Sequence, residues 1–344
     1  MAFAGPAAPI QDTNDVTDKS LKSIDRATTW LLKAQNRDGS WGIDSKGEPD
    51  VTCTSLAAMA MMAAGNTERS GPHQASIQAV RLAVEWMLKR ASNAKGNIAR
   101  SDSTLIQGKL GHTVHTFFAV VFLSQAYGMR IGTREQLQEM RELISEQVAV
   151  IAKTQEADGS WHKNTFGSLK ATCMAWLALR AADSGGIDVN DATVDKVMSF
   201  IKRQFDKASG LCVGQYGVGS YQTIYATASC LRVLYGMGQG NSPECPRAAD
   251  ALMKFVKDGA MGQQYLTCEG EDFLSAAMMT QSMLIEDGER WKKWFPWIRD
   301  ELMKRQANDG SWTGTACISG RTFATSCALL TLQAPFRLLP ISEQ

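Results

Sequence analysis

Two kinds of helical segment alternate along the chain. The first kind spaces apolar residues among charged ones at helical intervals, as at Leu21, Ile24, Ala27 and Leu31, which predicts amphipathic helices with one face in solvent. The second kind is apolar nearly all round, which predicts helices buried on most sides. The amphipathic segments are residues 20–33, 77–90, 137–153, 193–203, 248–257 and 291–304. The apolar segments are residues 50–65, 112–128, 168–182, 221–236, 274–288 and 321–335.

A short phrase recurs where amphipathic segments end. Gln-x-x-Asp-Gly-Ser-Trp occurs at residues 35–41, 155–161 and 306–312, and weaker copies lie near residues 204–210 and 257–262. A signature that recurs at helix ends indicates a helical repeat. Glutamine can bond exposed helix-end groups, glycine permits the turn, and tryptophan covers the next helix. We therefore expect Trp41, Trp161 and Trp312 to have a structural role and to pack between neighbouring helix pairs.

Six amphipathic helices that alternate with six buried ones predict two concentric rings. The predicted fold is all-α, an α6/α6 toroid built from six helical hairpins. An open solenoid of helix pairs is the competing geometry, and the near-uniform burial of the second set favours closure. Because the repeat runs without a linker, we predict one domain, residues 19–344, after a disordered arm, residues 1–18.

Composition narrows the functions. The 36 Lys and Arg residues balance 35 Asp and Glu residues, so no basic field for nucleic acid is present. No apolar stretch is long enough to span a bilayer, which leaves peripheral membrane contact open. Cys53, Cys173, Cys230 and Cys327 fall inside predicted buried helices, which favours free thiols over disulfides. The Ala- and Pro-rich start is compatible with the remnant of a cleaved signal peptide, so cytoplasmic and exported locations both stay open, as does the oligomeric state.

The recurrent phrase resembles the QW motif of triterpene cyclases and the related repeat of protein prenyltransferase β subunits. Residues 29–41, 149–161 and 300–312 carry the resemblance, which covers nearly the whole chain and implies the terpenoid cyclase and prenyltransferase toroid fold. In the cyclases an Asp-x-Asp-Asp motif begins an inner helix, and its second acid protonates an alkene or epoxide. The matching place here begins with Asp50 but has Thr52 at the proton donor's position, and a threonine hydroxyl cannot protonate an alkene. Conventional cyclisation at this position is therefore not expected.

A second acidic cluster enters the fifth apolar segment. Glu269, Glu271 and Asp272 have the Asp-x-Asp-Asp spacing, with glutamates for two aspartates. If Glu271 is buried beside Asp272, repulsion and desolvation raise one pKa and leave a protonated acid. The alternative is an acidic first turn that complements the helix dipole, which is common.

Four residues could hold zinc. Asp50 and Cys53 are three apart at the start of one apolar segment, and His112 and His115 are three apart at the start of the next. Residues at i and i+3 share a helix face, and Asp, Cys and two His suit tetrahedral zinc. The pattern is similar to the zinc site of prenyltransferase β subunits, although the family has one residue between Asp and Cys rather than two. The four residues are the candidate metal ligands, and packed core residues are the alternative.

The starts of the six apolar segments should line one end of a central cavity. The expected catalytic residues are Asp50, His115, Glu271 and Asp272. The expected substrate-binding residues are His112, Phe117, Trp176, Tyr221, Tyr225 and Arg321, with Ser168 and Lys170 also in the wall and methionines further in. An apolar pocket with polar groups at one end suits an isoprenoid-like ligand. Two functions stay open: a cyclase-like or zinc-dependent prenyltransferase-like enzyme, or a non-catalytic toroid that binds a lipid or a protein.

Overall fold

The computed structural model describes residues 15–65, 74–99, 104–163, 167–212, 221–257, 270–286, 288–314, 318–339 and 341, with the side chains of 221–223, 255–257 and 270 left out of the description. The described residues hold helices and no strand, and two isolated bridges, Gly42–Pro49 and Phe205–Cys212, are their only β contacts. Among them, no helix is both long enough and apolar enough to cross a membrane. Most of the predicted N-terminal arm, up to residue 14, lies outside this description.

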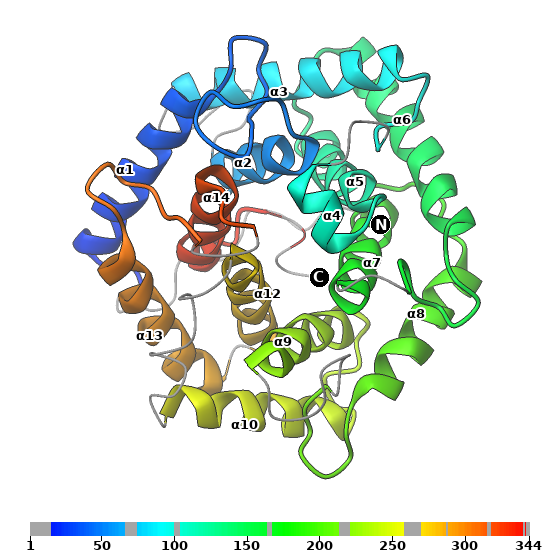
Figure 1. The fold of residues 1–344 in the computed structure, drawn as a ribbon, viewed down its shortest axis with the longest axis vertical. Helices are drawn as coiled ribbons and strands as arrows, with labels where there is room; N and C mark the ends of the chain where they lie inside the picture. Colours follow the sequence, from blue (N-terminus) through cyan, green and yellow to red (C-terminus); the bar gives the residue numbers. More distant parts are fainter. Residues whose placement is uncertain are drawn as a thin grey trace.

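The helices form two concentric rings (Figure 1). The outer ring contains α1 (Asp18–Ala34), α3 (Gln74–Asn93), α6 (Arg134–Lys153), α8 (Asp191–Gln204), α10 (Glu244–Lys257) and α13 (Glu289–Arg305). The inner ring contains α2 (Val51–Ala63), α5 (Val114–Gly128), α7 (Ser168–Ser184), α9 (Tyr221–Gly236), α12 (Gly270–Glu286) and α14 (Arg321–Leu332). The short helix α4 (Leu105–Leu110) precedes α5, and the 3-10 turn η1 (Ala334–Phe336) follows α14.

The inner ring closes on itself. Each inner helix packs on the next one along the chain, and α14 packs on both α12 and α2. The predicted all-α toroid is confirmed, and the open solenoid is excluded by the contact between the last inner helix and the first. Side chains in the first turns of α2 and α5 contact each other, and so do residues near the ends of α14 and α2. The inner helices therefore begin at one end of the ring, which we call the mouth, and finish at the far end.

The Gln–Trp turns, residues 35–41, 155–161 and 306–312, each join an outer helix to the inner helix that follows. The tryptophans of these turns are fully or almost fully buried. In the second turn, the indole Nε1 of Trp161 donates to the Ile151 carbonyl at 3.0 Å, and the Trp161 amide donates to Thr172 Oγ1 at 3.0 Å. The same pair of bonds runs from Trp41 to Leu31 and Thr54, and from Trp312 to Leu302 and Thr325. Each tryptophan thus ties its outer helix to its inner helix.

Glutamine and glycine of the same turns reach the next outer helix. In the first turn, Gln35 Nε2 donates to the carbonyls of Gly39 and Ala79, both at 2.9 Å, and Ala79 lies in α3. Gly39 has φ of +93°, and a Cβ there would collide with the backbone of Leu82 in α3. Only glycine combines that backbone conformation with so close an approach. The turn therefore sets the spacing between neighbouring hairpins.

The fourth and fifth repeats lack this tryptophan but still have a hydrogen bond to a threonine of the inner helix. In the fourth, the amide of Cys212 takes the position of the tryptophan amide and donates to Thr227 Oγ1 at 2.8 Å. In the fifth, Thr280 accepts instead from the indole of Trp294 at 2.9 Å, a residue of the following outer helix. In these two repeats the threonine on the inner helix is thus kept as the acceptor while its donor changes.

The far end of the inner ring is covered by the segment after α14. Ile341 donates its amide to Gln125 Oε1 at 3.0 Å, and its carbonyl accepts from Arg232 Nη2 at 2.6 Å. Arg232 is fully buried, and its Nε donates to Gln281 at 2.9 Å. No carboxylate of the described residues pairs with this guanidinium, whose pKa is lowered by burial and by the charge of Arg180. The chain therefore crosses the axis of the ring at this end (Figure 1).

Candidate functional site

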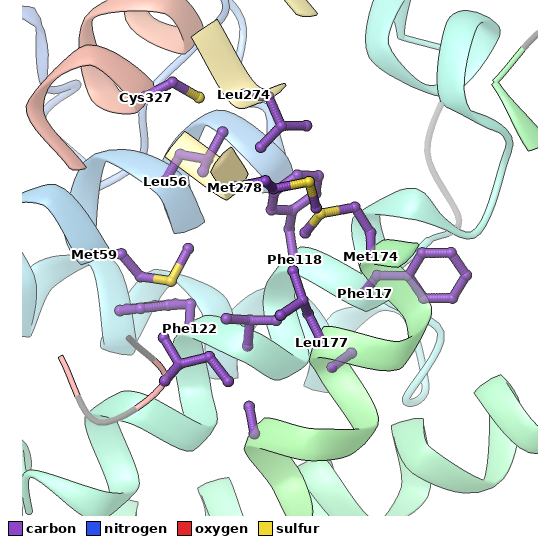
Figure 2. Close-up of a cluster of buried hydrophobic side chains, with 14 of the residues drawn as sticks. Leu56, Met59, Phe117, Phe118, Phe122, Met174, Leu177, Leu274, Met278 and Cys327 are labelled. Carbon is purple, nitrogen blue, oxygen red and sulfur yellow. The ribbon is translucent and has the colours of Figure 1, made fainter. Parts of the chain in front are cut away.

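Polar side chains line the mouth end of the inner ring, one helical turn before apolar ones. Figure 2 shows Leu56, Phe118, Met174 and Leu274 converging from α2, α5, α7 and α12. Residues three or four positions earlier on a helix share its face. The positions one turn earlier are occupied by Thr52, His115, Lys170 and Glu271. We call the buried set at that level the polar layer, which comprises Asp50, Thr52, His115, Lys170, Tyr225 and Glu271.

Below the polar layer, the centre of the inner ring is apolar (Figure 2). Its side chains come from four different inner helices and are nearly or fully buried. Five of these eight residues are phenylalanines or methionines, and methionine adapts readily to neighbours of different shape. We call this set the apolar layer, which comprises Leu56, Met59, Phe118, Phe122, Met174, Leu177, Leu274 and Met278.

Asp50 and His115 form a buried pair in the polar layer. Asp50 is the N-cap of α2 and accepts the Cys53 amide at 2.8 Å through Oδ1. Its Oδ2 lies 3.3 Å from His115 Nε2, which is also 3.2 Å from the hydroxyl of Thr104. Thr104 is placed there because it caps α4 in a capping box with Gln107.

The environment of Asp50 favours its ionised form. Burial is the largest single effect and would raise the pKa of this carboxyl group. The interactions with His115, the Cys53 amide and the Thr104 hydroxyl together outweigh burial, so the pKa is lowered from its ordinary value. Because an ionised carboxylate only accepts hydrogen bonds, the proton between the two residues belongs to His115 Nε2. Asp50 is consequently unsuited to protonate an alkene, and Thr52 cannot replace it.

Lys170 and Glu271 form a second pair across the ring. The Lys170 ammonium contacts Glu271 Oε2, which links the first turns of α7 and α12. The same ammonium lies 5.8 Å from the ring centroid of Tyr225 on α9, within the range of a cation–π contact. Glu271 is 1% exposed, and Asp272 beside it is fully buried. Of the two predicted acids, Glu271 thus has Lys170 as a cationic partner.

Several buried polar atoms at this end have no hydrogen-bond partner in the described residues. They include Nδ1 of His115 and Oε1 of Glu271, together with hydroxyl oxygens in the first two turns of the inner helices: Thr52, Thr116, Ser275 and Thr322. Buried polar groups in folded proteins are nearly always satisfied, so a cluster of such atoms indicates water or a ligand among them. These atoms make the mouth end of the inner ring the candidate binding site.

Two of the expected wall residues turn away from the polar layer. Arg321 lies outward, where it pairs with Asp309 and stacks on Trp30, with its guanidinium carbon 4.9 Å from the ring centroid. Phe117 meets Trp161 edge-on, with centroids 6.1 Å apart. These side chains therefore support the frame.

Trp176 lies near the far end, with the Arg232 guanidinium carbon 5.7 Å from its ring centroid. Tyr225 is in the polar layer as expected, whereas the side chain of Tyr221 lies outside the described residues. The expected substrate-binding residues are thus divided between the two ends of the ring.

The four candidate zinc ligands do not assemble. No group of three or more His, Cys, Asp or Glu side chains in the described residues is arranged to hold a metal ion. His112 is exposed and lies close enough to His162 to lower the pKa of that ring, after the larger effect of burial. Cys53 is fully buried, and burial and the charge of Asp50 raise its pKa far above the ordinary value, so the thiol stays protonated. Only Asp50 and His115 meet.

Thr104 is the residue of the site that the sequence analysis missed. Its signal was the sequence Thr104-x-x-Gln107, with the apolar pair Leu105-Ile106 between the two residues, a capping box that predicts the start of a helix. That helix, α4, lies at the mouth beside α5 (Figure 1).

Solved structures share the fold. No protein-family model matches the sequence, and no curated protein matches it either. The type II terpene cyclase MstE from Scytonema is 16% identical with a TM-score of 0.56, over 94% of this chain and 100% of that one. A variant of the α-1,6-mannanase of Salegentibacter sp. HEL1_6 in complex with α-1,6-mannotetrose is 9% identical with a TM-score of 0.60, over 94% and 100% of the two chains. These similarities show an α/α toroid, a fold with more than one activity.

Proposed function

We propose that the protein binds an amphipathic, isoprenoid-like molecule in its inner ring, with the polar head in the polar layer and the hydrocarbon chain along the apolar layer. The observation that carries this proposal is the cluster of buried, partnerless polar atoms directly above converging apolar side chains. A ligand of this kind would satisfy both layers at once, as apolar pockets with few polar groups do. The terpene cyclase MstE, solved with geranylgeranyl dihydroxybenzoate, supports the choice of hydrocarbon.

The alternative is a protein-binding scaffold with a ring that holds only water. A scaffold requires no apolar chain beneath the polar layer and would bind its partner on an outer surface. The fold is compatible with either function, since the mannanase with the same fold is bound to a carbohydrate. The two functions differ in whether the apolar layer admits a molecule.

Binding can be tested by native mass spectrometry and by titration with squalene and geranylgeraniol. The variant Met278→Trp adds bulk to the apolar layer and should weaken binding at least tenfold, because overfilling a packed interior excludes other molecules. Leu21→Trp is the matched control, since Leu21 is exposed on α1. Thermal unfolding must show that both variants fold. Absence of binding to the unmodified protein, or equal binding by both variants, would leave the scaffold as the better function.

The Asp50–His115 pair favours catalysis as a second candidate, by removal of a proton from the bound molecule. Asp50 contacts the ring at Nε2, which leaves Nδ1 as the nitrogen that can face the bound molecule. A base of this kind suits proton abstraction rather than alkene protonation. Incubation of ligand with protein, followed by product analysis, tests it: His115→Asn should abolish conversion while binding persists. No product from the unmodified protein would restrict the function to binding.

A further inference from the structure

We infer that the head group accepted by the polar layer donates hydrogen bonds, as a hydroxyl or an ammonium group does, and that diphosphate and carboxylate heads are excluded. This inference rests on the proposed function and specifies its class of ligand. It follows from two observations on the described residues. These are the atoms of the polar layer that lack hydrogen-bond partners and the groups that the Lys and Arg side chains contact.

Among the described residues, one partnerless atom of the polar layer has a fixed role as an acceptor. Glu271 Oε1 is a carboxylate oxygen, and its other oxygen is already bound to Lys170. His115 contacts Asp50 through Nε2, so Nδ1 is the ring nitrogen that has no partner there. The hydroxyls of Thr52 and Ser275 adopt either role. A head group that donates can satisfy Glu271, whereas one that only accepts leaves its oxygen unsatisfied.

The charges of the site oppose an anion. Two acids of the polar layer, Asp50 and Glu271, are 4% and 1% exposed, and in the described residues the charge of Lys170 is already engaged by Glu271. Like charges in a buried site repel strongly because water does not screen them. An anionic head would therefore need further cations.

Two arginines of the described residues, Arg321 and Arg90, do not supply those cations. Arg321 turns outward to Asp309. The charge of Asp50 raises the pKa of Arg90, although burial, the larger effect, lowers it. The guanidinium carbon of Arg90 lies 5.5 Å from the Trp86 ring centroid, and Arg90 and Trp86 line a groove along the outer helix α3.

The starts of α2 and α12 do not offer an alternative cradle for phosphate. The first amides of an inner helix could bind an anion, but in α2 the Asp50 carboxylate already accepts the Cys53 amide. In α12, Glu271 and Asp272 occupy the first turn themselves. At these two helix starts, the protein's own carboxylates thus hold the positions that a diphosphate would require.

A series of molecules with one hydrocarbon chain and different heads tests the inference. Geranylgeraniol, geranylgeranylamine, geranylgeranoic acid and geranylgeranyl diphosphate would be titrated at neutral pH by calorimetry. We expect the alcohol and the amine to bind at least 100-fold more tightly than the diphosphate. Glu271→Gln keeps the size of the side chain, removes its charge and adds a donor, so it should reduce that ratio at least tenfold. Glu286→Gln makes the same change near the end of the same helix and should leave the ratio unchanged.

The possible outcomes separate failure of the proposed function from failure of the inference about the head group. If none of the four molecules binds to the folded protein, the proposed function fails. If the acid or the diphosphate binds as tightly as the alcohol, the proposed function stands and the inference about the head group is overturned. If the preference exists but Glu271→Gln leaves it unchanged, the assignment of the head group to the polar layer is overturned. A preference that only Glu271→Gln weakens supports the inference.

Discussion

Gln306 donates a hydrogen bond from its side-chain amide to the carbonyl of Ser23 at 2.9 Å, across 283 residues of sequence. The same amide donates to Gly310 within its own turn, and the Gln306 side-chain oxygen accepts from the Ser23 hydroxyl. In the first and second Gln–Trp turns, the equivalent bonds join one outer helix to the next. The last turn therefore closes the outer ring, because its glutamine makes to α1 the same bond that the other two glutamines make to the next outer helix.

Replacement of Gln306 by Leu should weaken this closure. The change removes the bonds to Ser23 and Gly310 and leaves partly buried carbonyls without donors, which should cost about 1–3 kcal/mol in the free energy of unfolding. Urea denaturation measures the cost. Gln155→Leu removes the corresponding pair of bonds inside the ring and is the matched control. Local exchange of amide hydrogens should rise in α1 only for Gln306→Leu, and unchanged exchange in α1 would contradict a role in closure.

Two features of position 310 require glycine: its backbone conformation and the close approach of α1. Its φ of +94° is strained for other residues, and a Cβ would lie 2.6 Å from the Arg26 carbonyl of α1. Gly310→Ala should therefore cost more than the roughly 1–2 kcal/mol of left-handed strain alone. Gly238→Ala supplies that reference, because Gly238 has φ of +69° and no neighbour within 4 Å of its added Cβ. Equal losses of stability in the two variants would show that the close approach is unimportant.

Trp161 should stabilise the protein through its ring and through its N–H group. Trp161→Ala empties a fully buried position and should cost about 3–5 kcal/mol. Trp161→Phe keeps most of the apolar contact but leaves the Ile151 carbonyl without its indole donor, so its cost should be smaller. Chemical denaturation separates the two variants. Loss of ligand binding in Trp161→Phe without loss of stability would contradict a structural role.

Asp50 should make stability depend on acid pH. Its pKa is lower in the folded protein than the ordinary value of about 3.9 in an unfolded chain. The contribution of its ionised form is complete above that pH and is lost as pH falls through the folded pKa. Asp50→Asn keeps an N-cap residue and lacks this titration. The stability difference between the two proteins should shrink between neutral pH and pH 2 or so, in denaturation measured across that range. A constant difference would refute the assignment.

Arg232 should hold the segment that covers the far end. Arg232→Met removes the donor to the Ile341 carbonyl, so amide exchange should increase in residues 338–341. Arg180→Met is the control, because Arg180 lies close enough to affect the Arg232 charge but pairs with Asp183 instead. Hydrogen exchange with mass spectrometry measures the protection of this segment in both variants. Equal protection of the segment in all three proteins would mean that apolar burial of Leu339 and Ile341 is sufficient to hold it.

The repeat could be predicted from the sequence because its signals are local. A Gln–Trp turn places its glutamine, glycine and tryptophan within seven residues, and each makes a bond or contact that its own chemistry requires. Amphipathic spacing likewise fixes which face of α1 is buried. Ring closure followed from the burial of the inner helices on all sides.

The direction of side chains on the inner helices could not be predicted in the same way. α2 and α5 are buried all round, so apolar periodicity does not indicate which face meets the centre. Phe117 and Phe118 differ by one position, and only Phe118 points to the centre of the ring, while Phe117 packs on Trp161. Arg321 begins α14 at the mouth, yet its direction depends on Asp309, which is brought near by the fold. A position near the start of an inner helix predicts that the residue lies at the mouth of the ring. It does not predict whether the side chain faces the centre of the ring.

The contact of α14 with α2 has a consequence for how the chain folds. During synthesis α1 and α2 emerge first, but their outer and inner neighbours on one side are α13 and α14, which emerge last. Until then the first hairpin has one flank uncovered, and bonds such as that from Gln333 to the Ala60 carbonyl, 273 residues apart, cannot form. Contacts of such long sequence separation slow folding. A nascent chain that stops before α13 would therefore present two uncovered apolar flanks, of α2 and of α12, to chaperones and to other copies of itself.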